Sequence, residues 1–229
     1  AIYQIAPVFR QDERGPLHNP EFTMVEWYRV GDGYAEGKAL LGELAEVLLG
    51  RGEAQWLSYT EAFERFANVH PLSAPVEELA AVARQRLADA PELDCDDRDG
   101  WLDLLLCACI QPHLGLEKPL ILFDYPASQS ALANIREDAY PVAQRFELYV
   151  DGVELANGYH ELTDPAELRR RNAEVNRRRL RDAKAPLPEE SRLLEAMDRG
   201  LPAATGVALG FDRLVMVAAG ATSLDEVLA

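Results

Sequence analysis

The segment "HNPEFTMVEWYRV", from His18 to Val30, decides the fold. From Phe22 onward it alternates with the two-residue period of a β-strand, so that Phe22, Met24, Glu26 and Tyr28 share one face. Acidic side chains are costly to bury unless they find partners. The alternation alone leaves open why a carboxylate and a phenol lie beside an aromatic ring and a methionine on one face of a strand.

The segment upstream predicts the partner strand. Ile2 to Arg10 is apolar and β-branched, and "QDERGPLHNP" follows as a polar loop with Gly15-Pro16 as a turn signal. We expect these residues and Phe22 to Val30 to form a long hairpin. Because the chain opens directly on an apolar strand, we expect that strand to be buried and a segment to be missing before it.

Bulk composition excludes several classes of protein. The chain has 229 residues, 48% of them hydrophobic, and a net charge of -16 from 39 acidic and 23 basic residues. This length allows one well-buried domain, and the charge argues against general DNA or RNA binding. No apolar run approaches the roughly 18 residues of a membrane span. Cys95, Cys107 and Cys109 lack the spacing of a disulfide framework or zinc site, so we expect reduced thiols in the cytoplasm.

The next part of the chain is patterned for helices. From Tyr34 to about Cys109 the apolar residues recur with helical spacing, and the first helix is expected to end at Gly50. The buried stripe expected on it consists of Leu40, Leu41, Leu44, Val47 and Leu48. "KPLILFDYP", residues 118–126, then predicts a short buried strand.

A second hairpin is the strongest local signal. "AQRFELYVDGVELANGYHEL", residues 143–162, contains two strands joined by the two-residue turn Asp151-Gly152. With this turn, Tyr149 faces Glu154, and Glu147 and Glu154 become diagonal neighbours on one face. Two carboxylates so placed can hold one metal ion or one cationic ligand; the alternative is a solvated outer face of an edge hairpin.

The C-terminal part completes an α+β pattern. Asp164 is expected to cap a helix rich in arginine, residues 188–200 predict another helix, and "TGVALGFDRLVMVAAG", residues 205–220, predicts a strand that runs into a helix. The order of elements indicates an α+β fold with a largely antiparallel sheet.

Three segments could share one ligand. They are "FRQDERGPLHNPEF" with Arg10, "GVALGFDR" with Arg213, and the set formed by Glu147, Glu154 and Glu161. Alone, each has an ordinary structural explanation as a strand end, a packed turn or a solvated face. Together, two arginines and three glutamates that converge on a sheet fit a polyphosphate with divalent metal ions.

These segments carry a family resemblance. "FRQDERGPLHNPEFTMVEWYR" resembles motif 2 of the class II aminoacyl-tRNA synthetases, "GVALGFDRLVM" resembles their motif 3, and "RFELYVDGVELANGYHELTD" resembles the lysine-subclass segment between them. The chain is most similar to the elongation factor P β-lysine ligases. The resemblance implies a class II synthetase-like catalytic domain over 1–229, with an antiparallel sheet flanked by helices, a helical insertion at about 34–117 and no motif 1. It also implies a homodimer for the full-length protein.

The resemblance implies a site for ATP and Mg²⁺. Phe22 and Arg213 would stack on the adenine, Arg10 would hold the α-phosphate, and Glu147 and Glu154 would bind magnesium. The other nucleotide-binding positions implied are Asp12, His18, Asn19, Leu155 and Gly210. Asp12 stands where the family usually has glutamate, and the family builds its dimer interface with the motif 1 that this chain lacks.

The amino-acid pocket follows from the same resemblance. Glu161 would receive the substrate side-chain ammonium with help from Tyr28, and the remaining pocket residues implied are Glu26, Asn157, Tyr159 and Ala208. Regular alternation puts Glu161 on the face opposite Glu154, so we expect a β-bulge near Ala156-Asn157-Gly158.

The implied activity is that of an ATP-dependent ligase. It would activate (R)-β-lysine as an aminoacyl-adenylate and transfer it to a lysine side chain of elongation factor P. Ala208, where lysyl-tRNA synthetases usually carry glycine, and the acidic surface argue against tRNA as acceptor. The alternatives are a lysyl-tRNA synthetase fragment that activates α-lysine and a non-catalytic paralogue that binds ATP or the amino acid.

Overall fold

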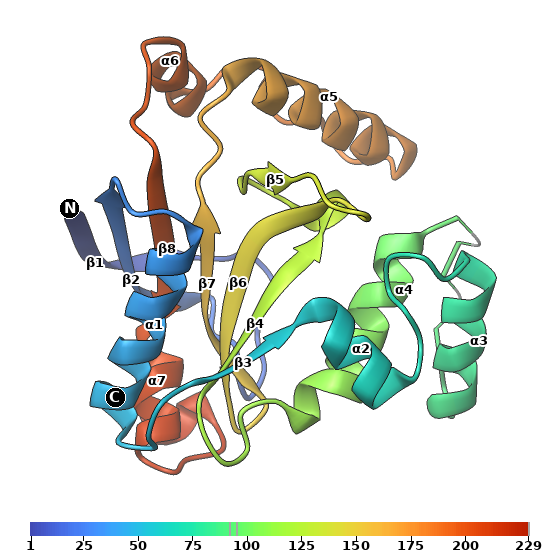
Figure 1. Cartoon of the computed structure of the whole chain (residues 1–229), viewed down its shortest axis with the longest axis vertical. Coiled ribbons are helices and arrows are strands. Elements are labelled where there is room, and N and C mark those ends of the chain that lie inside the picture. Colours follow the sequence, from blue (N-terminus) through green and yellow to red (C-terminus); the bar gives the residue numbers. More distant parts are fainter. Residues whose placement is uncertain (92, 95, 229) are drawn as a thin grey trace.

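A single β-sheet organises the computed structural model, which describes residues 1–91, 93–94 and 96–228 (Figure 1). Within them, all neighbouring strands are antiparallel except β3 and β4, which confirms the α+β fold with a largely antiparallel sheet. The strand order is β1 (Ile2–Phe9), β2 (Glu21–Val30), β8 (Ala204–Gly210), β7 (Val153–His160), β6 (Val142–Val150), β4 (Leu120–Pro126) and β3 (Gln55–Ser58), with β5 (Ile135–Arg136) paired to β6.

The first hairpin forms as predicted but lies at the sheet edge. β1 pairs with β2 from Ile2↔Tyr28 to Phe9↔Glu21. The expectation that β1 is buried is wrong, because Tyr3 is 78% exposed and Ile2 70% exposed. The strand has a paired neighbour on one side and, in the described chain, neither of its faces is covered by a helix layer.

The second hairpin carries a bulge that decides which side chains share a face. Its turn is Asp151-Gly152, with Val150 opposite Val153 and Tyr149 opposite Glu154 as predicted. The next pair is Leu148↔Ala156, so Leu155 is the extra residue, one position before the segment in which we expected the bulge. Downstream of the bulge, each side chain of β7 points to the face opposite the one that regular alternation predicts.

This change in the direction of the side chains creates a polar front face of the sheet. We define the front face as the side of the sheet that carries Glu26, Glu154 and Glu161; the bulge brings Glu161 to the side of Glu154. The opposite, back face carries Phe146, Leu148 and Leu209 and is packed against two helices.

Helices α1 (Tyr34–Leu49) and α7 (Phe211–Ala218) cover the back face (Figure 1). Helix α1 ends at Gly50 as predicted, but its expected apolar stripe is wrong in part, since Val47 is 80% exposed and Leu48 51% exposed. Its buried residues are Gly37, Leu41, Gly42 and Ala45. A Cβ at Gly37 would collide with the side chain of Thr205, so the helix approaches the sheet through its smallest residues.

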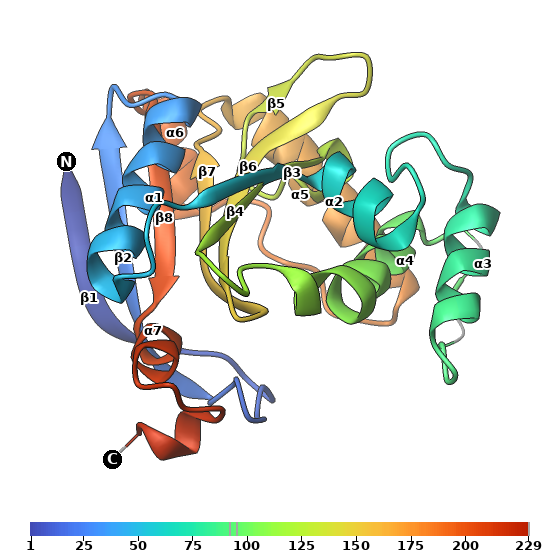
Figure 2. The ribbon, with the colours of Figure 1, turned by 60° about the horizontal axis from the view of Figure 1, so that its bottom comes forward.

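The middle of the chain packs on the front face at the β4 end (Figure 2). It comprises α2 (Tyr59–Ala67), α3 (Val76–Arg86), α4 (Arg98–Leu105), a π-helical turn (Leu106–Ile110) and a 3₁₀ turn (Gln111–His113). The pattern did not predict strand β3, which interrupts this helical region and pairs with β4. Cys107 and Cys109 are free thiols, while Cys95 lies outside the described residues.

Helices α5 (Pro165–Arg181) and α6 (Arg192–Asp198) lie together at the upper end of the sheet in Figure 1. Asp164 caps α5 as predicted, accepting hydrogen bonds from the backbone amides of Ala166 and Glu167. Short 3₁₀ turns lie at Ala127–Gln129 and Leu224–Glu226. None of the helices in the described part of the chain is long and apolar enough to cross a membrane.

We expect Gly115→Ala to lower the free energy of unfolding by about 2–4 kcal/mol. Gly115 has φ +71°, and an added Cβ would collide with the backbone of Tyr149 and Val150. Gly50→Ala is the matched control, because Gly50 has φ +64° with nothing within 4 Å of the added Cβ. That variant should lose only about 1–2 kcal/mol, the cost of the left-handed backbone alone. Equal losses in urea unfolding would contradict the packing argument.

Candidate active site

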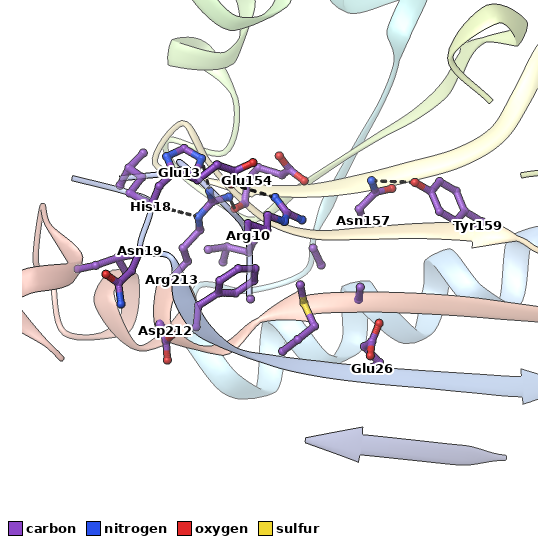
Figure 3. Close-up of a pocket in the computed structure, with 18 residues that line it drawn as sticks. Arg10, Glu13, His18, Asn19, Glu26, Glu154, Asn157, Tyr159, Asp212 and Arg213 are labelled. Carbon is purple, nitrogen blue, oxygen red and sulfur yellow. Dashed lines mark hydrogen bonds and ion pairs between the residues drawn. The ribbon is translucent and has the colours of Figure 1, made fainter. Parts of the chain in front are cut away.

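A cavity of about 350 Å³ opens on the front face of β2, β8 and β7, beside the loop that joins β1 to β2 (Figure 3). Most of the residues predicted from the sequence line it together. They are Arg10, His18, Asn19, Phe22, Glu26, Glu154, Leu155, Asn157, Tyr159, Ala208, Gly210 and Arg213. Three strands and one helix that are distant in sequence thus supply one concave surface.

Four predicted residues do not line this cavity. Asp12 is exposed, with φ +61°, and Glu13 lies at the cavity instead. Tyr28 and Glu161 meet beyond its far end, where a Cβ on Gly206 would touch both side chains. Glu147 is buried beneath the surface and only 3% exposed.

Arg213 is held at one end of the cavity. Its Nε donates to the carbonyl of Leu17 at 3.0 Å and its Nη1 to the carbonyl of Glu154 at 3.0 Å. Its Nη2 lies 2.8 Å from His18 Nε2. Because a guanidinium only donates hydrogen bonds, His18 Nε2 is the acceptor here. Burial, followed by the positive charge of Arg213, lowers the pKa of His18, which agrees with this role. The guanidinium thereby ties the β1–β2 loop to β7.

Arg10 and Phe22 lie beside this cluster. The guanidinium of Arg10 stands 5.3 Å from the centroid of the Phe22 ring and pairs with Glu13 at 3.4 Å. An aromatic ring next to two guanidinium groups suits a flat base attached to phosphates, since arginine binds phosphate oxygens and stacks on π-systems.

The Glu154 carboxylate is the acidic group of this end. Burial, and then the charge of Glu147, raise the pKa of Glu154 above its ordinary value. A cation placed at Glu154 would remove this penalty. Glu147 is less accessible, because Tyr125, Tyr149 and Arg145 all donate hydrogen bonds to its oxygens.

Only a partial protein ligand set for a divalent metal is present. Within the residues that the structure describes, no group of three or more His, Cys, Asp or Glu side chains surrounds a common metal position. Magnesium, however, is commonly bound by one or two carboxylates together with phosphate oxygens and water. Glu154 fits such a site, whereas Glu147 has a single acceptor position left.

The region beyond the far end of the cavity suits an amine. Burial raises the pKa of Glu161 to about 7, and burial together with the Glu161 charge raises the pKa of Tyr28. Asn157 Nδ2 donates to the Tyr159 hydroxyl at 3.1 Å, and Figure 3 shows this pair beyond the charged cluster. Asn157 Oδ1 is buried and accepts no hydrogen bond within the described residues, so it is free to accept one from a ligand.

Several residues of the site were not predicted from the sequence. Asp212 accepts a hydrogen bond from the backbone amide of Thr23 at 2.9 Å and so attaches β2 to α7. Arg145 and Tyr149 could have been found from strand alternation, which puts both on the face of Glu147. Tyr125 could not, because its contact with Glu147 depends on the register between β4 and β6.

Known proteins match this chain over its whole length. The family of class II tRNA synthetases (D, K and N) matches residues 1–229. An elongation factor P--(R)-beta-lysine ligase of Vibrio vulnificus (strain YJ016) is 43% identical over 229 residues, which cover 100% of this chain and 71% of the relative. The enzymes of that name from Edwardsiella ictaluri (strain 93-146) and Salmonella dublin are 44% and 43% identical and are covered to 70%.

The match and the geometry agree. The segments that resemble motifs 2 and 3 form β2, β8 and the start of α7, and they meet at the cavity. Both the family match over residues 1–229 and the full-chain identity support one classification. The chain belongs to the class II tRNA synthetase family, in the group of the elongation factor P (R)-β-lysine ligases.

Proposed function

We propose that this chain activates (R)-β-lysine with ATP and transfers it to a lysine side chain of elongation factor P in the cytoplasm. The observation that carries the proposal is one front face of the sheet, with two arginines at the cavity and, beyond its far end, the partly buried carboxylate of Glu161, whose pKa is raised. The names of its relatives supply the identity of amino acid and acceptor.

The nucleotide would occupy the arginine end. Phe22 and Arg213 would hold the adenine between them, and Arg10 would meet the α-phosphate, where negative charge grows as the substrate carboxylate attacks. His18, Asn19, Leu155 and Gly210 line the same end of the cavity. Glu13, which lies at the cavity, would make the contact expected of Asp12.

Magnesium would be held at Glu154, with Glu147 behind it. When bound, the metal supplies charge neutralisation for the phosphates. The protein's own part is to keep Glu154 at the cavity wall, which it does through the bulge at Leu155 and the hydrogen bond from Arg213 to the Glu154 carbonyl.

The amino acid would lie across β8 with its side-chain ammonium at Glu161 and Tyr28. Ala208 stands directly between Glu26 on β2 and Asn157 on β7, so its methyl group limits the space for the substrate backbone. Asn157 Oδ1 and the Glu26 carboxylate, both at the cavity, would be acceptors for a second amino group.

Both chemical steps need orientation and charge stabilisation more than a protein nucleophile. The β-lysine carboxylate oxygen attacks the α-phosphorus, the bond to pyrophosphate breaks, and an aminoacyl-adenylate remains. The neutral ε-amine of the acceptor lysine then attacks the acyl carbon, an amide forms, AMP leaves and the amine proton passes to solvent.

ATP–pyrophosphate exchange without tRNA tests the activity. We expect exchange with (R)-β-lysine to exceed that with α-lysine. Preference for α-lysine would favour a lysyl-tRNA synthetase activity, and absence of exchange with both would reject an adenylate-forming enzyme in this chain.

Ala208→Gly should reduce the preference for (R)-β-lysine by about tenfold, because removal of one methyl group from a substrate pocket changes discrimination by roughly 1–3 kcal/mol. The ratio of kcat/KM values for the two isomers measures this effect. Val207→Ala is the matched control, since Val207 is the neighbouring residue on β8 but packs in the back-face core. An unchanged ratio in Ala208→Gly would show that Ala208 does not contribute to discrimination between the two isomers.

Glu161→Gln should abolish amine binding while stabilising the free protein. The raised pKa of Glu161, about 7, means that the folded state binds its proton more tightly than the unfolded chain does. Its ionisation therefore destabilises the wild type increasingly from about pH 4.5 to about pH 7.

The variant lacks this ionisation. Its free energy of unfolding should match the wild type near pH 4.5 and exceed it by about 1–3 kcal/mol at pH 8. Urea unfolding at the two pH values measures the difference. A variant that is less stable at pH 8, or that still binds the substrate with wild-type affinity in calorimetry, would contradict the role of Glu161.

A further inference from the structure

Glu147 is an unusual carboxylate because three donors hold it in the interior. Tyr125 donates its hydroxyl to Oε2 at 2.5 Å and Tyr149 donates to the same oxygen at 2.6 Å. Arg145 donates from Nη2 to Oε1 at 2.5 Å. The residue is 3% exposed, so the protein itself, rather than water, solvates this side chain.

The donors are themselves fixed. Tyr125 is 1% exposed and Tyr149 2% exposed, and both belong to the core under α2 and α4. Arg145 also donates from Nη1 to the carbonyl of Gln129 at 3.0 Å, and its guanidinium lies 4.5 Å from the centroid of the Tyr125 ring. Glu147 thus cannot change its rotamer without breaking contacts to a rigid part of the molecule.

This arrangement gives different roles to the two carboxylates of the β6–β7 hairpin, Glu147 and Glu154. A carboxylate offers about four acceptor positions, and three of those on Glu147 are taken. Glu154, its diagonal neighbour, lines the cavity, and its carboxylate accepts no hydrogen bond from the described residues. Only Glu154 is placed to meet a ligand without first giving up a charge-assisted hydrogen bond.

We propose that Tyr125, Tyr149 and Arg145 are positioning residues that fix Glu147 as a buried anion behind Glu154, so that Glu154 contacts the metal ion of the metal–nucleotide complex and Glu147 acts through its charge. This inference rests on the proposed function. Residues that orient a metal ligand commonly change metal affinity by 10–100-fold when they are removed. We expect an effect of that order for residues that fix a charge directly behind the ligand.

The competing arrangement makes the opposite prediction. If Glu147 binds the metal directly, the tyrosine hydroxyls compete with the metal for Oε2. Removing them would then leave metal affinity unchanged or increase it. Substitution of the two tyrosines therefore distinguishes a Glu147 that binds the metal directly from a Glu147 that acts only through its charge.

The test uses Tyr125→Phe, Tyr149→Phe and the double variant in the full chain. Binding of Mn²⁺ in the presence of ATP is followed by electron paramagnetic resonance, and ATP binding without a divalent metal by calorimetry. The magnesium dependence of pyrophosphate exchange then separates an effect on the metal concentration for half-maximal rate from an effect on kcat.

We expect the double variant to bind Mn²⁺ about 10–100-fold more weakly, with metal-free ATP binding unchanged and exchange restored at high magnesium concentration. Tyr59→Phe is the matched control. Tyr59 is 0% exposed, packs 4.9 Å from the Tyr125 ring, and its hydroxyl has no hydrogen-bond partner among the described residues. This variant should bind Mn²⁺ as the wild type does.

Unchanged or tighter Mn²⁺ binding by the double variant would overturn the inference. If the double variant unfolds, the two single variants decide, each with a weaker but measurable loss of Mn²⁺ affinity expected and wild-type affinity in both overturning the proposal. A wild type that binds Mn²⁺ with ATP but shows no exchange would reject the proposed function alone, because the binding measurement does not depend on catalysis.

Discussion

The extra residue at Leu155 is the constraint on which the site depends. In a regular strand, Glu154 and Glu161 would point to opposite faces, because seven residues separate them. With Leu155 directed to the back-face core, Glu154 keeps the front face before the bulge and Asn157, Tyr159 and Glu161 gain it afterwards. Glu154, at the cavity, and Glu161, just past the end of β7 and beyond the far end of the cavity, therefore face the same side of the sheet.

Two carboxylates of the front face, Glu154 at the cavity and Glu161 beyond its far end, carry an electrostatic cost. Burial raises the pKa of Glu161 and, together with Glu147, that of Glu154, so each carboxylate is less stable as an anion than it would be in water. A bound ammonium or metal cation reverses that cost. These anions lower the stability of the free protein, and a ligand of opposite charge removes that destabilisation when it binds. Ionisable groups placed in this way therefore increase the affinity for such ligands.

The back face explains why the strands hold this arrangement. Phe146, Leu148 and Leu209 pack against α1 and α7, and α7 begins directly after the β8 residues that line the cavity. Asp212, in the first turn of α7, accepts a hydrogen bond from the Thr23 amide on β2, while Arg213 reaches the loop and β7. One helix start therefore aligns three segments of the site.

The sequence pattern predicted correctly those features that depend on interactions between residues close together in the chain. Both hairpins, the Asp151-Gly152 turn, the Asp164 cap and the end of α1 at Gly50 follow from turn chemistry and backbone preference. The prediction of the buried stripe of α1 was confirmed for Leu41 but wrong for Val47 and Leu48. The pattern selects large apolar residues, whereas this helix also approaches the sheet through Gly37 and Ala45.

By itself, the sequence determined the antiparallel hairpins, the need for a bulge between Glu154 and Glu161, and the family to which the chain belongs. Only the tertiary structure decided which carboxylate can meet a ligand, Glu154, and which is enclosed by hydrogen-bond donors of the protein, Glu147. The hydroxyl of Tyr125 reaches Glu147 across a strand pair, and Glu13 rather than Asp12 turns toward the cavity. Such contacts join residues through strand register and loop conformation, and these depend on the packing of the whole sheet rather than on the neighbours of each residue along the chain.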